Sequence, residues 1–189
     1  MPARDRTTPL VLPFMGPFYE RIAEPLALLG LRLAVGALLV IEGWPKITAP
    51  FAMSGFVENI GLHPGWLWSA VLAAMQFIGG LMILAGVLTR PAALVNGAML
   101  AVTLWFHMSH PYGGAILSPE GMATLAENGA MFTADGLRNL AADGGATFLH
   151  QVQFKAEGLS TLWTAAAFLL AAFGAGPVSV DRALLKREF

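Results

Sequence analysis

The sequence predicts an all-α integral membrane protein, a bundle of four transmembrane helices with a long outer loop between helices three and four. Composition and the lengths of the apolar stretches predict this class. Hydrophobic residues make up 56% of the 189 residues and charged residues only 12%, whereas about a quarter of a soluble domain is charged. In water such a chain would expose larger apolar patches than soluble monomers carry, so the lipid bilayer is its predicted surrounding.

Net charge and cysteine content exclude several functions. The formal net charge is −1, which argues against a nucleic-acid partner because such binding needs a concentrated basic surface. The chain has no cysteine, which excludes a disulfide relay, a thiolate nucleophile, an iron–sulfur cluster and a covalently attached c-type haem. Electron transfer would therefore need a quinone, a histidine-ligated metal or haem, or a cofactor held by a partner.

Four stretches have the length of a membrane span, which is about 20 mainly apolar residues. Pro25 and Pro91 stand at the starts of the first and third stretches, where proline suits the first helical turn. Pro111 stops the third stretch, and Pro177 follows the end of the fourth. The predicted spans are residues 25–44, 66–88, 91–108 and 157–176.

The remaining segments follow from these spans. Prolines interrupt the short apolar run before the first span, so residues 1–24 are predicted to form an interfacial arm. Residues 25–185 are the membrane domain, residues 109–156 its outer loop, and residues 186–189 a cytoplasmic tail. Within the loop, Ser118-Pro119-Glu120 is typical of a helix start, and the spacing of Leu137 and Leu140 predicts a second, amphipathic helix.

The distribution of Lys and Arg predicts the orientation, because cytoplasmic segments carry an excess of both. The side with both termini holds Arg4, Arg6, Arg21, Arg90, Arg182, Lys186 and Arg187, and the opposite side holds Lys46, Arg138 and Lys155. The protein is therefore expected in the cytoplasmic (inner) membrane, multi-pass, with both termini in the cytoplasm.

Several short motifs follow one another along the chain. They are Arg-Leu-Ala-Val-Gly at 32–36, Gly-Trp-Pro-Lys at 43–46, Gln-Phe-Ile-Gly-Gly at 76–80, Gly-Val-Leu-Thr-Arg at 86–90, Lys-Ala-Glu at 155–157, Gly-Ala-Gly at 174–176 and Ser-Val-Asp-Arg at 179–182. In their order and spacing, over roughly residues 28–185, they resemble the DoxX family of small bacterial four-helix membrane proteins.

The resemblance implies a function linked to redox chemistry. The family takes its name from the membrane part of a terminal or thiosulfate:quinone oxidoreductase, and other members are linked to quinone or redox-stress responses. It implies a membrane subunit of a quinone-linked oxidoreductase or redox-stress complex, with quinone as cofactor and a soluble or membrane redox enzyme as partner. The chain departs from the family pattern at four places. Gln76 stands where a carboxylate is common, and Glu42 where a neutral residue or histidine is common. The outer loop is longer, and Pro177-Val178 replaces the more usual Arg-Tyr before the Ser-x-Asp element.

Polar residues inside the spans are the candidate ligand-binding groups, because such residues tend to face the bundle interior or a cavity. Asn96, Thr103, His107 and His110 share one face of the third helix, which fits either interhelical hydrogen bonds or a lined cavity. His150, Gln153 and Glu157 share a face on the fourth segment. Two or three histidines without a ligand-rich motif do not predict a metal site, whereas an imidazole can hydrogen-bond a quinone carbonyl.

These residues predict one polar cavity in the outer half of the bundle, lined by Glu42, Gln76, His107 and Glu157. The further ligand-binding candidates are Lys46, His110 and His150. At the cytoplasmic end, Arg32 and Asp181 are predicted to form a structural ion pair that closes the bundle. Two other functions stay open: a non-catalytic membrane scaffold or assembly factor, and a carrier of small solutes or protons, which the small size and lack of an obvious repeat favour less.

Overall fold

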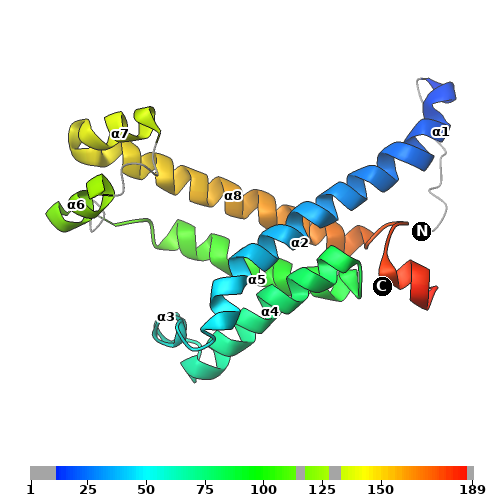
Figure 1. The fold of residues 1–189 in the computed structure, drawn as a ribbon, viewed down its shortest axis with the longest axis horizontal. Helices are drawn as coiled ribbons and strands as arrows, with labels where there is room; N and C mark the ends of the chain where they lie inside the picture. Colours follow the sequence, from blue (N-terminus) through cyan, green and yellow to red (C-terminus); the bar gives the residue numbers. More distant parts are fainter. Residues whose placement is uncertain (1–11, 114–117, 128–132, 187–189) are drawn as a thin grey trace. The chain divides into compact units, whose positions relative to one another are not determined.

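The computed structural model describes residues 12–113, 118–127 and 133–186, and the regular elements in these ranges are helices (Figure 1). Four of them are long and apolar enough to cross a membrane, which confirms the predicted all-α membrane fold. These helices are Gly16–Thr48, Gly65–Ala85, Thr89–Ser109 and Asp143–Phe173. The chain divides into two compact units: residues 1–96 with 166–189, and residues 97–165.

The first long helix begins well before the predicted span. A short 3-10 turn, Pro13–Met15, leads into α1, Gly16–Phe18, then a π-helical turn, Tyr19–Ala23, and α2, Glu24–Thr48. The π turn lies just before Pro25, whose ring would otherwise press on the carbonyl of Arg21. Residues 16–24 thus continue the first helix, residues 1–11 lie outside the described ranges, and the membrane position of the predicted arm stays a prediction.

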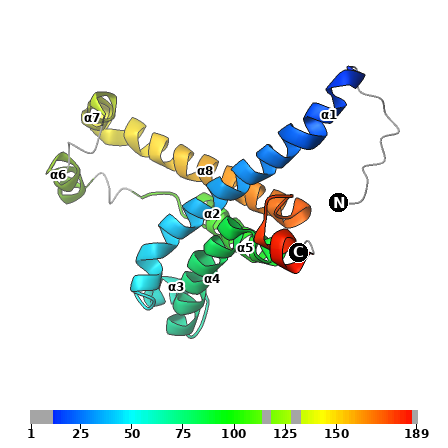
Figure 2. The same cartoon turned by 45° about the vertical axis from the view of Figure 1, so that its right-hand side comes forward.

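Glycines bring α2 close to α4, Gly65–Ala85, and the two helices lie side by side in both views (Figures 1 and 2). A Cβ atom on Gly36 would lie 2.7 Å from the backbone nitrogen of Leu84, and one on Gly43 2.9 Å from the Cα of Phe77. On α4, a Cβ atom on Gly80 would lie 2.8 Å from the Cβ of Leu39. Small residues at such an interface let helix backbones approach closely in a membrane.

The two ends of α4 are closed by specific hydrogen bonds. At its start, the carboxylate of Glu58, from α3 (Ser54–Asn59), accepts from the backbone nitrogen of Gly65 at 2.8 Å. At its end, Gly86 has φ +77°, and the backbone nitrogens of Gly86 and Val87 both donate to the carbonyl of Met82. A left-handed residue in this position ends the helix and turns the chain into α5, Thr89–Ser109.

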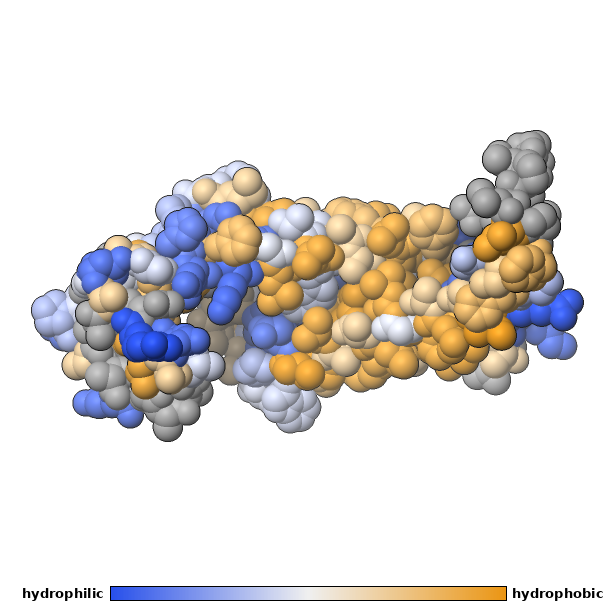
Figure 3. All heavy atoms as spheres, turned by 90° about the horizontal axis from the view of Figure 1, so that it is seen from above, coloured by the Kyte–Doolittle hydropathy of each residue, from blue (hydrophilic) through white to orange (hydrophobic). Residues whose placement is uncertain are grey.

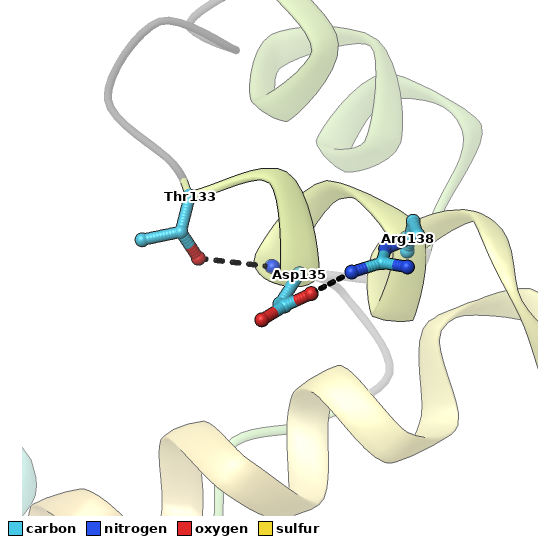
Figure 4. Close-up of polar contacts among 4 residues, drawn as sticks. Thr133, Asp135 and Arg138 are labelled. Atoms are coloured by element: carbon cyan, nitrogen blue, oxygen red, sulfur yellow. Dashed lines mark hydrogen bonds and ion pairs between the residues drawn. The ribbon is translucent and has the colours of Figure 1, made fainter.

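The second unit holds the end of α5, the short helices α6 and α7, and the first part of α8, Ala146–Phe173. Both short helices were predicted. Ser118 accepts from the backbone of Gly121 at the start of α6, Pro119–Glu127. Thr133 caps α7, Ala134–Ala141, by accepting from the backbone of Gly136, and Asp135 pairs with Arg138 (Figure 4). Hydrophilic residues gather over α6 and α7, whereas hydrophobic residues cover much of the long helices (Figure 3).

The last long helix corrects the predicted loop boundary. Residues 146–156, assigned to the outer loop, form the first turns of α8. The carboxylate of Asp143 accepts hydrogen bonds from the backbone nitrogen and the hydroxyl of Thr147, which stabilises this start. The predicted span contained only the apolar stretch. The hydrogen bonds to Asp143 stabilise a helix that begins before this stretch, in polar sequence.

Candidate functional site

The predicted ligand-binding residues fall into the two compact units. Glu42, Lys46 and Gln76 belong to the first unit, and His107, His110, His150 and Glu157 to the second. The single cavity shared by residues of both units therefore stays a prediction. Each unit nevertheless brings some of the candidates together by itself.

In the first unit, Lys46 and Gln76 form a polar contact between α2 and α4. The ammonium nitrogen of Lys46 donates to the side-chain oxygen of Gln76 at 2.7 Å. Gln76 is 4% exposed and Lys46 is half-buried, so the contact is shielded from solvent. Glu42 lies one turn before Lys46 on α2, where its charge attracts that of Lys46, but its side chain is exposed and the ammonium hydrogen-bonds to Gln76.

Replacing Gln76 with leucine is expected to lower the free energy of unfolding by about 1.5–3 kcal/mol, because the Lys46 ammonium loses its acceptor. Gln76→Glu is the matched control. A carboxylate of nearly the same shape also accepts from the ammonium, so this variant should keep its stability. Thermal unfolding in detergent, followed by circular dichroism, measures both variants. Equal losses in the two variants would show that the contact does not stabilise the unit.

In the second unit, Gln153 of α8 joins three polar groups. Its amide nitrogen donates to the carbonyl of His107 at 2.8 Å and to the carboxylate of Glu157 at 2.6 Å, and its oxygen accepts from the backbone nitrogen of Tyr112 at 2.9 Å. These contacts fix the orientation of the amide, because the flipped form would point its oxygen at two acceptors. Gln153 therefore holds Glu157 and the end of α5 in place.

The sequence places Gln153 on the same helix face as Glu157, but Gln153 is not among the predicted ligand-binding residues. The available signal was its position four residues before a carboxylate, which places both side chains on one helix face. The contacts with His107 and Tyr112 join positions more than 40 residues apart in the chain, and no local spacing predicts such contacts.

Aromatic rings surround the two histidines at the end of α5. The His107 ring lies 5.9 Å from that of Tyr112, and the His110 ring stacks on Phe106 at 4.5 Å. Trp105 approaches His110 edge-on at 6.0 Å. His107 is half-buried, and His110 and His150 are exposed. A flat, conjugated ligand could extend this set of rings by stacking.

The predicted polar face of α5 has different partners along its length. Asn96 is 1% exposed and donates to the carbonyls of Met75 and Ala92 at 3.2 and 2.9 Å. The first of these bonds joins α5 to α4, as expected for interhelical hydrogen bonding. Thr103 is exposed and donates to the carbonyl of Met99 within its own helix.

The predicted pairing of Arg32 with Asp181 differs from the observed contacts. One guanidinium nitrogen of Arg32 donates to the carbonyls of Ala175 and Val178 at 3.0 and 2.5 Å. Both carboxylate oxygens of Asp181 are buried without a hydrogen-bond partner among the described residues. No hydrogen bond thus joins the two side chains, because the chain after α8 offers its carbonyls to Arg32. A longer-range ion pair stays a prediction.

Four long apolar helices and several buried polar side chains define a multi-pass integral membrane protein. The sequence model of the DoxX family matches residues 27–108. The inner membrane protein YqjF of Escherichia coli (strain K12) is 30% identical over 165 residues, covering 87% of this chain and 96% of YqjF. The chain belongs to the DoxX family. None of the solved structures matches it.

Proposed function

We propose that this DoxX-family protein is the membrane subunit of a quinone-linked oxidoreductase or redox-stress complex. The observation that carries the proposal is the surroundings of His107 at the end of α5. A half-buried imidazole lies there next to a tyrosine ring, and Gln153 joins its backbone to Glu157.

This group of residues suits a quinone headgroup in three ways. An imidazole donates a hydrogen bond to a quinone carbonyl and accepts one from a quinol hydroxyl. The neighbouring rings offer stacking surface for a flat ring. Glu157 supplies a carboxylate for the protons that accompany quinone reduction, and Gln153 holds it in one orientation.

A non-catalytic scaffold or assembly factor is the second candidate. Hydrogen bonds between polar side chains favour this candidate: Lys46 donates to Gln76, and Gln153 donates to Glu157. Such pairs stabilise a helix bundle without any ligand. The two candidates differ in whether the purified protein carries a cofactor.

Purification in mild detergent, followed by organic extraction, is expected to yield bound quinone. His107→Ala should lower the amount of quinone per chain by roughly tenfold, the effect of losing one hydrogen bond of about 1.4 kcal/mol. His63→Ala is the matched control, because His63 is an exposed histidine in the segment before α4. A colourless, quinone-free protein that co-purifies with a soluble enzyme would contradict the quinone proposal and support the scaffold.

We further propose that the protein lies in the inner membrane, as the name of its relative YqjF states for that protein, with both termini in the cytoplasm. The distribution of Lys and Arg supports this orientation. Cysteines introduced at Ala123 and Ala183, which are both exposed, should react with an impermeant thiol reagent from opposite sides of the membrane. The absence of native cysteine keeps the background low, and reaction of both from one side would refute the orientation.

A further inference from the structure

Four polar side chains of the first unit lie around two turns, the one between α4 and α5 and the one after α8. We call Arg32, Thr89, Arg90 and Asp181 the turn cluster. Thr89 and Asp181 are 0% exposed and Arg32 is 4% exposed. The proposed quinone site uses none of them.

Backbone contacts hold the members of the cluster near one another. The backbone nitrogen of Asp181 donates to the carbonyl of Gly86 at 3.0 Å. A Cβ atom on Gly86 would lie 2.7 Å from a guanidinium nitrogen of Arg32, and Thr89 follows three residues later. A Cβ atom on Gly174 would lie 3.0 Å from the Nε of Arg90, and the neighbouring Ala175 accepts from Arg32.

The hydrogen-bonding groups of the cluster are incompletely paired. Three buried donors have no acceptor among the described residues: the Nε atoms of Arg32 and Arg90, and the hydroxyl of Thr89. Both carboxylate oxygens of Asp181 are buried acceptors that receive no hydrogen bond from the part of the chain that the structure describes. Each buried polar group left unpaired costs about 1–3 kcal/mol, and a charged group costs more. A ligand that both donates and accepts would remove these costs.

We propose that the turn cluster binds one or more buried water molecules, which join the carboxylate of Asp181 to the donors of Arg32, Arg90 and Thr89. Water fits because it donates two hydrogen bonds and accepts two, and a buried water typically makes about three. An anion would be repelled by the Asp181 carboxylate, and a metal cation by the two guanidinium groups. The attraction between Arg32 and Asp181 then acts through water.

The bound water joins two parts of the chain that are distant in sequence. Thr89 and Arg90 open α5, whereas Asp181 lies in the segment after α8. Direct bonds already connect the region at two points: Arg32 donates to the carbonyls after α8, and the backbone of Asp181 donates to Gly86. Water completes the connection through the side chains, and it does so independently of any quinone.

Radiolytic hydroxyl-radical labelling of the full chain in detergent tests the proposal, because radicals formed from a bound water react with the side chains that hold it. After each rate is divided by the intrinsic reactivity of its residue type, Arg32 and Thr89 are expected to be labelled at least about fivefold faster than the fully buried apolar side chains of Leu39 and Ile83. Labelling of Arg32 at the slow rate of Leu39 and Ile83 would overturn the proposal.

Two variants at Thr89 test whether its hydroxyl holds the water. Thr89→Val keeps the shape but removes the hydroxyl, and should lower the labelling rate of Arg32 at least about twofold. Thr89→Ser keeps the hydroxyl and should leave that rate unchanged. A map of the protein in nanodiscs at a resolution that shows water should contain a peak within hydrogen-bonding distance of Asp181 and of one donor. Direct contact of Asp181 with Arg32, without such a peak, would exclude the bridge.

Discussion

Replacing Gly36 with valine is expected to separate α2 from α4 and to lower the stability of the first unit. A Cβ atom at this position would lie 2.7 Å from the Leu84 backbone nitrogen and 2.9 Å from its Cα. Backbone atoms cannot rotate away as a flexible side chain can, so the two helices must move apart. Overpacking of this kind costs about 1–3 kcal/mol or more, and thermal unfolding in detergent measures it.

Gly30→Val is the matched control, because the same change on the same helix meets open space. Apart from the adjacent turns of its own helix, no described part of the chain lies within 4 Å of a Cβ placed on Gly30. The melting temperature of this variant should lie within a few degrees of that of the unchanged protein. Valine and glycine differ in helix propensity by much less than a backbone clash costs. Similar losses in the two variants would mean that the glycine contact between α2 and α4 does not hold the unit together.

Gln153→Glu is expected to loosen the end of α5 and to lower the free energy of unfolding by about 2–4 kcal/mol. In the unchanged protein the Gln153 side chain hydrogen-bonds to three partners, and the variant loses some of these bonds. A carboxylate still accepts from the backbone nitrogen of Tyr112, but it cannot donate to the carbonyl of His107. It also brings a second negative charge against Glu157, which lies 2.6 Å from the amide nitrogen in the present protein. Hydrogen exchange of residues 105–113 and thermal unfolding report the two effects.

Gln153→Met separates the lost hydrogen bonds from the added charge. Methionine has a similar length but neither donates nor carries a charge, so it should be less harmful than glutamate. If glutamate and methionine lowered the stability equally, charge repulsion with Glu157 would have no role.

The sequence was sufficient to predict the helices, because the requirement for an apolar span is local and depends on composition over about 20 residues. The boundaries were less predictable. The cap at Asp143 and the π turn before Pro25 extend two of the long helices beyond their apolar stretches. Such extensions depend on a few hydrogen bonds, which the mean hydropathy of a window does not record.

The polar contacts were harder to predict than the helices for a different reason. Gln76 and Lys46 were candidates because they are polar residues in an apolar membrane domain, but only the close approach of α2 and α4 brings their side chains within 2.7 Å. Arg32 was expected to pair with the carboxylate of Asp181, whereas the hydrogen bonds that the structure shows for it go to two backbone carbonyls. The left-handed residues Gly174 and Gly176 shape the turn after α8, and the geometry of such a turn decides which acceptors a buried arginine meets.

The unbroken helix from Gly16 to Thr48 has a mechanical consequence. Its 33 residues extend about 50 Å at 1.5 Å per residue, whereas the hydrocarbon layer is about 30 Å thick. Even a tilt of about 20° leaves several turns outside the hydrocarbon, joined to the span without a flexible loop. Phe18 and Tyr19 therefore lie on the same continuous helix as Gly36 and Gly43. A rotation of the N-terminal end of this helix would also rotate the two glycines that pack against α4.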